Sequence, residues 1–545
     1  MDEKTTGQAA AGRPSAMTAA TDPAPPREVE VKFRAAVAQL KAVRTSPLLG
    51  EAKASPAREL ITTYFDTADK DLRRNGLMLR VRRKGRAIPV LSIKWQTPSE
   101  EGLFARGEME VRCPDGLPAI ERFDPATQER LAAALKGKPL EPIFETRCRR
   151  AVTVFRYGHS EIELAVDDGA ITAGDARLPL CEIELELKSG NSIDLLKCAS
   201  ELARGCELTL EFEAKSDRGY RLAEGAQPKA QKATALALPD AITFDDLLAA
   251  VITNTLNHFV SNWASLRDSD APEAVHQLRV SLRRMRSALG IFRRVIALPE
   301  LEDIRSEARR IASALGPARE CDAFRQNALS GPMSGQTEQI RGALPLLEAV
   351  AKRRQESYAE ARRVIDDPAA SLFVLRVQGF VFTRAWRTAL APQDLGLLTT
   401  PGKIYAATVL DRLLKRALKR GKHMPDMPDE ERHEVRIALK NLRYASEFFG
   451  GLFADGKGLR NYLGLVADLQ EDLGAHNDAA TAKSFIESLQ LPSEPGTHFA
   501  TGYLLGWYRH ATMVADGHLA KKCEAFKRAD IFWEWGRRSS VQENP

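Results

Sequence analysis

Apolar and charged residues alternate with a period of two through much of the first half of the chain. Successive side chains of a β-strand point to opposite faces, so this alternation predicts strands with one apolar and one charged face. The pattern occurs in six segments: 28–33, 79–82, 91–96, 106–112, 161–164 and 181–188. We also expect helices at residues 125–135 and 193–204.

The second half of the chain has a helical pattern, and a short linker precedes it. Residues 225–238 combine Gln227 and Pro228 with several Ala and Lys residues, a composition typical of linkers. Residues 239–535 indicate helices only, and 536–545 are expected to be a tail. Residues 1–26, rich in Ala, Thr and Pro, are expected to be a disordered tail. We therefore predict an α+β multidomain protein, with a sheet domain at 27–224 and an all-α domain at 239–535.

Both signs of charge appear on the polar faces of the predicted strands. A solvated sheet surface explains any one of them. A closed barrel with its charged faces inside explains all six, and closure also removes the sheet edges. Buried charges are tolerated when they are paired or coordinate a metal, and a triphosphate with divalent cations would satisfy bases and carboxylates together. The residues alone therefore indicate a site for a metal ion together with a polyphosphate ligand.

Several motifs of the first half occur in the order of a known family. Residues Glu28-Val29-Glu30-Val31-Lys32 form an ExExK motif. It is followed by Tyr64-Phe65-Asp66-Thr67, Leu79-Arg80-Val81-Arg82, Ser92-Ile93-Lys94, Arg106-Gly107-Glu108-Met109-Glu110, Thr146-Arg147-Cys148-Arg149-Arg150, Asp167-Asp168-Gly169, Glu182-Ile183-Glu184-Leu185-Glu186 and Lys215-Ser216-Asp217-Arg218-Gly219-Tyr220. Over nearly all of residues 27–224 the chain resembles the CYTH superfamily, the triphosphate tunnel metalloenzymes.

The resemblance implies an eight-stranded antiparallel tunnel that hydrolyses a triphosphate with Mg²⁺ or Mn²⁺. The implied catalytic residues are Glu28, Glu30 and Lys32, and the implied metal ligands are Glu28, Glu30, Glu182, Glu184 and Glu186. The implied phosphate-binding residues are Lys32, Arg80, Arg82, Lys94, Arg106, Arg147, Arg149 and Lys215, and Asp167 would hold a base or the metal. Strand parity places Arg147 and Arg149 together on one face and leaves Arg150 a structural role. Glu108 and Glu110 are either further metal ligands or partners of the tunnel bases.

The substrate is less narrowly defined than the cavity, because one fold supports several reactions. No aromatic cluster clearly offers a platform for thiamine rings, since Trp95 and Phe104 suit a core as well. This favours inorganic triphosphate, split into diphosphate and phosphate. The alternatives are hydrolysis of thiamine triphosphate or a nucleoside triphosphate, adenylate cyclisation, or a non-catalytic protein that binds or tethers polyphosphate.

The helical half contains an internal repeat of basic residues. His276, Arg279, Arg283 and Arg286 have the same spacing as His433, Arg436, Lys440 and Arg443. Each copy is followed by a Leu-Gly pair, Leu315-Gly316 and Leu473-Gly474. A solvated helix face needs no such register, whereas a ligand with evenly spaced negative charges does.

The same repeat carries a second family resemblance. Residues 276–286 and 433–444 resemble the two signatures of the CHAD domain, a conserved-histidine α-helical domain, and the resemblance covers about residues 240–530. It implies two related helical bundles that bind inorganic polyphosphate along a basic groove. The implied groove residues are His276, Arg279, Arg283, Arg286, Arg319, His433, Arg436, Lys440 and Arg443. Nucleic acid is a less favoured partner.

The length, charge and cysteine content of the chain bear mainly on its expected cellular location. The chain has 545 residues, a net charge of +6 and seven cysteines without a CxxC pair, which favours neither a disulfide framework nor a thiolate zinc site. The sequence shows no apolar run of membrane-spanning length and no secretory signal. We expect a cytoplasmic protein without membrane contact, and the oligomeric state stays open.

Overall fold

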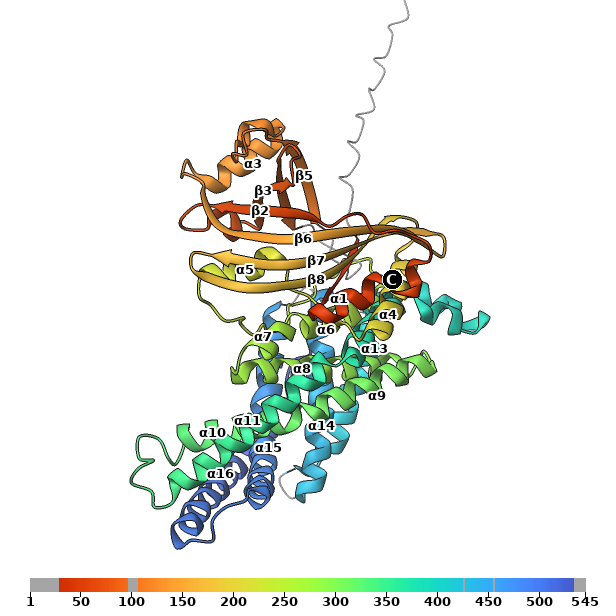
Figure 1. Ribbon diagram of the computed structural model, residues 1–545. Coiled ribbons are helices and arrows are strands. Elements are labelled where there is room, and N and C mark those ends of the chain that lie inside the picture. The colour runs from red at the N-terminus through yellow and green to blue at the C-terminus, as the bar shows by residue number, and fades with distance from the viewer. Residues whose placement is uncertain (1–28, 97–105, 425–426, 454–455, 534–545) are drawn as a thin grey trace, which may run out of the picture.

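The computed structural model describes residues 29–96, 106–424, 427–453 and 456–533. Glu28, Phe104 and the two predicted tails, residues 1–26 and 536–545, therefore lie outside the described residues. A curved sheet with its helices forms the first part, and a long array of helices forms the second (Figure 1). None of the described helices is both long and apolar enough to span a lipid bilayer.

All strand pairs of the sheet are antiparallel, in the order β5-β4-β3-β2-β6-β7-β8-β1-β9. The strands are β1 Glu30–Arg34, β2 Arg58–Asp66, β3 Leu77–Lys84, β4 Val90–Gln96, β5 Arg106–Arg112, β6 Glu141–Tyr157, β7 Ser160–Ala173, β8 Ala176–Ser189 and β9 Thr209–Leu210. The predicted fold class is confirmed. The sheet has nine strands rather than eight, because the two residues of β9 pair with β1, and in the described sheet β5 and β9 are the edges.

The helices of the sheet domain cover its apolar surfaces. They are α1 Val37–Arg44, α2 Asp71–Arg74, α3 Pro125–Leu135, α4 Ser192–Cys206 and α5 Lys215–Ala223. The predicted helices at 125–135 and 193–204 correspond to α3 and α4. The apolar face of β1, β7 and β8 packs with α1 and α4, while α5 packs on β6, β7 and β8. Each buried Leu, Ile or Val contributes roughly 1.5–3 kcal/mol, so the apolar residues are held against the helices and the alternate residues face the other way.

The second part is all helical, as the sequence predicts. Its helices are α6 Phe244–Val260, α7 Trp263–Asp268, α8 Pro272–Phe292, α9 Pro299–Ala314, α10 Gly316–Ser330, α11 Ala343–Asp366, α12 Pro368–Phe382, α13 Gly402–Arg420, α14 Asp429–Phe449, α15 Gly456–Ser488 and α16 Pro495–Lys527. The repeated basic motifs lie on α8 and α14, which pack against each other. The repeat therefore brings its two copies together.

The two parts share one continuous apolar core. Helix α4 of the sheet domain packs on α12, and both belong to the same cluster of buried residues. The backbone N–H of Leu210 donates to Ser371 Oγ across this boundary at 2.8 Å. The segment between the parts is also fixed, because Gln231 and Asn262 exchange two hydrogen bonds of 2.8 and 2.9 Å. The linker therefore lies against the helical part.

Candidate functional site

The curved sheet encloses a cavity of about 100 Å³, here called the sheet cavity. Strands β1 to β4 and β6 to β8 line it together with the first residues of α5. Its charged lining residues are Glu30, Lys32, Arg80, Arg82, Lys94, Arg150, Asp167, Glu184, Glu186 and Lys215. The charged faces of the strands thus converge on one interior space.

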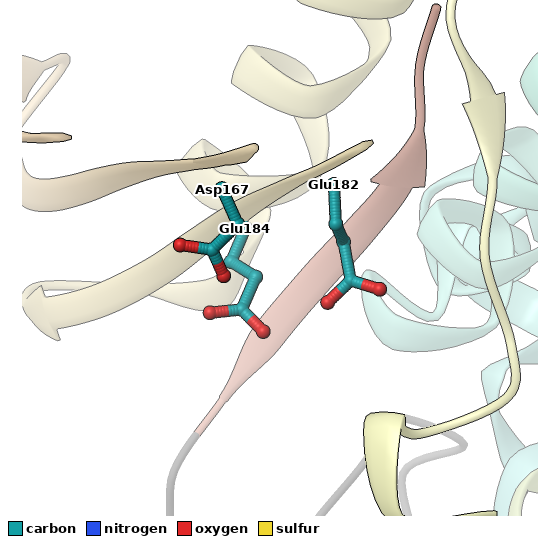
Figure 2. A group of neighbouring side chains, drawn as sticks. All are labelled: Asp167, Glu182 and Glu184. Atoms are coloured by element: carbon teal, nitrogen blue, oxygen red, sulfur yellow. The ribbon is translucent and has the colours of Figure 1, made fainter. Parts of the chain in front are cut away.

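Three carboxylates gather on one side of the sheet cavity. Asp167 on β7 pairs in register with Glu182 on β8, and Glu184 is two residues further along β8. Oxygens of these three side chains, here called the acid cluster, lie within 4.8 Å of one another (Figure 2). Asp167 and Glu182 are fully buried. Grouped buried carboxylates are stable only when cations balance them.

Lys215 supplies much of that balance. Its Nζ lies 2.8 Å from Asp167 Oδ2, 2.6 Å from Glu182 Oε1 and 2.7 Å from Glu184 Oε1. Burial opposes the charge of Lys215, but the three carboxylates outweigh it and raise its pKa. The sequence predicts Lys215 as a phosphate ligand, whereas the structure places its ammonium among the acids. It lies there because it is in the first turn of α5, which packs on β7 and β8.

Arg150 is the second internal cation. Its Nη2 lies 2.5 Å from Asp167 Oδ2 and 2.5 Å from Glu184 Oε2. Burial alone would raise the pKa values of Asp167 and Glu184, but Lys215 and Arg150 outweigh it and lower both. For Glu182 burial prevails over Lys215 and Arg218, so its pKa is raised.

Arg147 and Arg149 share one face of β6, as predicted, but the prediction that this face lines the cavity is wrong. Thr146, Cys148 and Arg150 face the sheet cavity, and Arg147 and Arg149 face solvent. The Arg147 side chain is 59% exposed and pairs with Glu59 and Glu145. Both faces of this strand carry arginine, so alternation alone does not say which face is interior. The solvated-surface explanation holds for Arg147 and Arg149.

The opposite wall of the sheet cavity is basic. Arg80 and Lys94 each lie 2.8 Å from an oxygen of Glu108, so Glu108 is a partner of the tunnel bases. Nearby Arg80, burial and Arg150 together lower the pKa of Arg82. The buried Nε of Arg82 has no hydrogen-bond partner in the described part of the chain. This crowding of positive charge favours an anion beside Arg82.

Two further predicted residues, Lys32 and Glu186, lie on the same cavity wall as the acid cluster. Lys32 Nζ lies 2.7 Å from Glu30 Oε1 and 3.8 Å from Glu184 Oε1. Glu186 pairs with Lys188 at 2.8 Å. Glu28 and the side chain of Arg106 lie outside the described residues. Oxygen ligands from the acid cluster, with Glu30 and Glu186 on the same cavity wall, fit a hard divalent cation.

The helical half has a larger and more basic cavity of about 670 Å³, here called the helical groove. It lies among α8, α10, α14 and α15, and its lining includes His276, Arg279, Arg283, Arg319, His433, Arg436, Lys440 and Arg443. Arg286 is not in this lining, because it faces α9, where burial, Arg305 and Arg309 lower its pKa. Sequence spacing therefore brings eight of the nine predicted groove residues together.

The glycine of each repeated Leu-Gly pair lies beside an arginine of the groove. A Cβ at Gly316 would lie 3.0 Å from Arg279 Nη1, and one at Gly474 would lie 3.6 Å from Arg436 Nη2. Gly316 therefore leaves room for the Arg279 guanidinium, whereas a Cβ at Gly474 would make only an ordinary van der Waals contact with Arg436. Arg283 Nε donates to Tyr444 Oη at 2.6 Å, which joins the two copies.

In the helical groove the repulsion among the bases outweighs the nearby acids Glu320 and Asp478. Burial, Arg436 and Arg283 lower the pKa of Lys440 to about 7, and Asp478 opposes this only in part. Burial, Arg283 and Arg319 likewise lower the pKa of Arg279, against Glu320. An anion in the groove would relieve this repulsion.

Comparisons with known proteins assign both halves. The CYTH domain family model matches residues 26–220, and the CHAD domain family model matches residues 250–487. An inorganic triphosphatase of Haemophilus influenzae is 32% identical over 164 residues, which are 29% of this chain and 45% of that relative. The chain thus spans less than half of that protein's length.

Two further relatives extend over more of the chain. An uncharacterised protein of Mycobacterium tuberculosis is 26% identical over 461 residues, covering 79% of this chain and 82% of the relative. The crystal structure of the CHAD domain from the plant Ricinus communis is 28% identical, with a TM-score of 0.42, covering 55% of this chain and 98% of that one. By its two family matches, the chain belongs to the proteins in which a CYTH domain is followed by a CHAD domain.

Proposed function

We propose that the sheet cavity hydrolyses inorganic triphosphate to diphosphate and phosphate, with Mg²⁺ or Mn²⁺. The observation that carries this proposal is the acid cluster facing Arg80, Arg82 and Lys94 across one enclosed space. The CYTH match and the partial match to an inorganic triphosphatase support the same reaction class. Phosphoryl transfer needs mainly positioning and charge stabilisation, and this wall arrangement supplies both.

The acid cluster, Glu30 and Glu186 would hold the cation. A bound divalent cation supplies neutralisation of phosphate charge and activation of water. Arg80, Arg82 and Lys94 bind the phosphate oxygens on the opposite wall, with the arginines able to form forked contacts. Glu108 orients Arg80 and Lys94 through its two 2.8 Å contacts.

Two internal cations change partners when substrate and cation bind. Lys215 and Arg150 neutralise the acid cluster in the structure described here. A divalent cation held by the acid cluster would neutralise these acids in place of Lys215 and Arg150. They are then available to phosphate oxygens, which agrees with the sequence prediction for Lys215. Each of these buried side chains therefore keeps a partner of opposite charge in both states, which limits the cost of burial.

The helical groove is proposed to bind inorganic polyphosphate. Its volume of about 670 Å³ and its two facing copies of the basic motif suit a chain of evenly spaced negative charges. Binding there would place long polyphosphate on the same molecule that hydrolyses triphosphate.

A substrate panel with the purified full-length protein tests the proposal. Tripolyphosphate, ATP, thiamine triphosphate and long-chain polyphosphate are each incubated with Mg²⁺, with Mn²⁺ and with a chelator. We expect tripolyphosphate to release phosphate fastest, and the chelator to abolish release. Tight polyphosphate binding without phosphate release from any substrate would instead show a tethering protein.

A further inference from the structure

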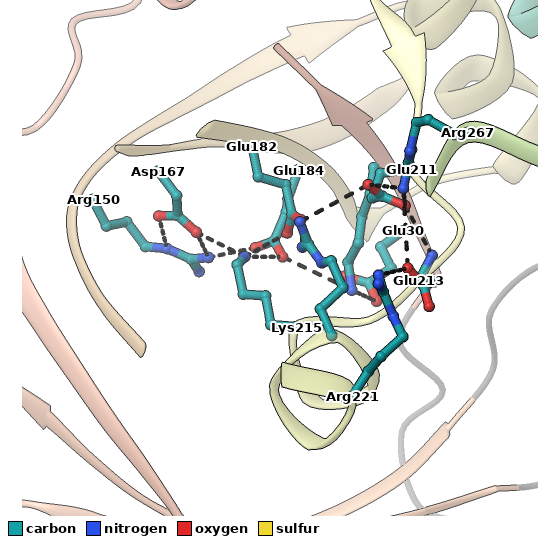
Figure 3. A network of polar contacts seen from close by, with 12 residues as sticks. Glu30, Arg150, Asp167, Glu182, Glu184, Glu211, Glu213, Lys215, Arg221 and Arg267 are labelled. Atoms are coloured by element: carbon teal, nitrogen blue, oxygen red, sulfur yellow. Dashed lines mark hydrogen bonds and ion pairs between the residues drawn. The ribbon is translucent and has the colours of Figure 1, made fainter. Parts of the chain in front are cut away.

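A line of buried charges connects the helical domain to the acid cluster (Figure 3). Arg267 on α7 lies 3.2 Å from Glu211, which directly follows β9. Glu211 lies 3.9 Å from Arg218 Nη1 on α5, and Nη2 of the same arginine donates to Glu182 Oε2. The other oxygen of Glu182 lies 2.6 Å from Lys215 inside the acid cluster. Two domains therefore contribute to one ion-pair chain.

Glu211 is so deeply buried that the loss of an ion-pair partner would be costly. Its side chain is 1% exposed, and those of Arg267 and Arg218 are 8% and 7% exposed. Water replaces an ion pair poorly at such burial, so Glu211 without Arg267 would draw the nearest remaining cation toward it. Arg218 is the next cation, and it already holds Glu182.

The contacts of Arg218 explain why this choice affects the acid cluster. Because Arg218 fixes Oε2 of Glu182, Oε1 points toward Lys215, Asp167 and Glu184. If Arg218 turned toward Glu211, the Glu182 carboxylate would lose the hydrogen bond from Arg218 that fixes its orientation. Partners that orient a metal ligand commonly change metal affinity by ~10–100-fold.

We propose that Arg267, a residue of the helical domain, is a positioning residue for the cation site of the sheet domain. It compensates Glu211 and so leaves Arg218 to orient Glu182. The inference rests on the proposed function in taking the acid cluster as the cation site. It makes cation binding in one domain depend on the docking of the other.

The helical domain holds Arg267 firmly in this place. Arg362 on α11 donates to the carbonyl oxygens of Leu266 and Ser269, at 3.1 and 3.0 Å, on either side of the end of α7. The segment that carries Arg267 is therefore anchored by α11 and leads directly into α8, which lines the helical groove.

Arg221 provides a matched control on the same interface. It lies on α5 and pairs with Glu213 at 2.7 Å and with Asp268 of α7 at 3.2 Å. Its pair with Asp268 crosses the domain boundary, its pair with Glu213 stays within the sheet domain, and neither pair reaches the acid cluster. Loss of Arg221 therefore removes a comparable interdomain contact and leaves Arg218 with Glu182.

The experiment compares full-length wild type with Arg267→Gln, Arg267→Lys and Arg221→Gln. Mn²⁺ binding is titrated calorimetrically without substrate, and thermal unfolding is recorded for each variant. We expect Arg267→Gln to bind Mn²⁺ about 10-fold more weakly, Arg267→Lys to recover part of the loss, and Arg221→Gln to stay within about twofold of wild type. Equal weakening in Arg267→Gln and Arg221→Gln, or none in either, would overturn the proposal.

A crystal structure of Arg267→Gln separates this inference from the proposed function. We expect Arg218 to contact Glu211 in place of Glu182. An unchanged Arg218–Glu182 contact would overturn the positioning role even if the enzyme were active. Absence of Mn²⁺ binding by wild type would instead contradict the proposed metal site, and the Arg218 position would still decide the role of Arg267.

Discussion

The sheet cavity and the helical groove both collect basic side chains, and they differ in what balances them. In the sheet cavity Lys215 lies among three carboxylates, which raise its pKa. In the helical groove Lys440 lies among arginines, and burial with Arg436 and Arg283 lowers its pKa to about 7. The same residue type is thus overstabilised as a cation in one site and destabilised in the other.

This contrast indicates two ways of binding phosphate. The sheet cavity already contains matched charges, so a ligand must exchange with internal partners and must bring a cation for the acids. The helical groove has surplus positive charge, so a polyanion binds by neutralising it. Counterion release makes binding of the second kind strongly dependent on salt.

The largest expected effect comes from removing an acid of the sheet cavity. Glu184→Gln takes away a carboxylate of the acid cluster, and we expect triphosphate turnover to fall by about 100-fold or more, since even indirect metal partners are worth ~10–100-fold. Phosphate release measures this. Glu145→Gln, which alters an acid paired with Arg147 outside the cavity, should be nearly neutral. Similar turnover in both variants, with both folded, would remove the acid cluster from the reaction.

The next effect breaks the helical groove and leaves the sheet cavity intact. Arg279→Ala combined with Arg436→Ala removes one base from each copy of the repeat. Hydrogen bonds to charged groups contribute ~1.5–3 kcal/mol each, so polyphosphate affinity should fall on the order of 100-fold. Triphosphate turnover should hardly change. Arg286→Ala, outside the groove lining, is the control, and parallel losses of binding and turnover in the double variant would contradict the division of labour.

A smaller effect sharpens which face of β6 is interior. Arg150→Ala should raise KM for triphosphate about 10-fold, because it removes a charged ligand worth ~1.5–3 kcal/mol from the cavity wall. Arg147→Ala should change KM very little, because its ion pairs are largely exposed. Steady-state kinetics of the two variants decide between the faces. A larger effect of Arg147→Ala than of Arg150→Ala would instead support the sequence prediction that Arg147 faces the cavity.

The smallest effect concerns pH in the helical groove. Lys440 faces Arg283 on α8, Arg436 on α14 and Asp478 on α15, and its pKa is lowered to about 7. A bound polyanion raises that pKa, so binding at pH 8 should take up a proton, and affinity should fall as pH rises above 7, by at most about tenfold per pH unit. Calorimetry in two buffers of different ionisation enthalpy measures the uptake. Lys440→Arg should remove it, and equal uptake by this variant would assign the proton elsewhere.

Local sequence pattern predicted much of this molecule because local geometry decides it. Helices α3 and α4 lie within two residues of their predicted ends. The spacing of the bases along α8 and α14 was sufficient to predict that they line one groove, because a helix turns by a fixed angle per residue. Arg286 does not line the groove as predicted, because its side chain faces the neighbouring helix α9.

Features that depend on distant segments could not be predicted in the same way. The interior face of β6 depends on its pairing with β2 and β7, and a single residue of shift exchanges Arg150 for Arg149. The place of Lys215 follows from the docking of α5 on the sheet, and that of Arg267 from the packing of another domain. Neither residue has a local pattern that reports its partners.

The continuous apolar core between the two parts has a practical consequence for anyone who divides this protein. Cutting the chain within 225–238 would uncover the side of α4 that now packs on α12, together with the matching side of α12. Each fragment would then carry an exposed apolar surface that favours self-association in solution. Truncated versions should therefore be compared for solubility and aggregation state before any loss of activity is attributed to a missing residue.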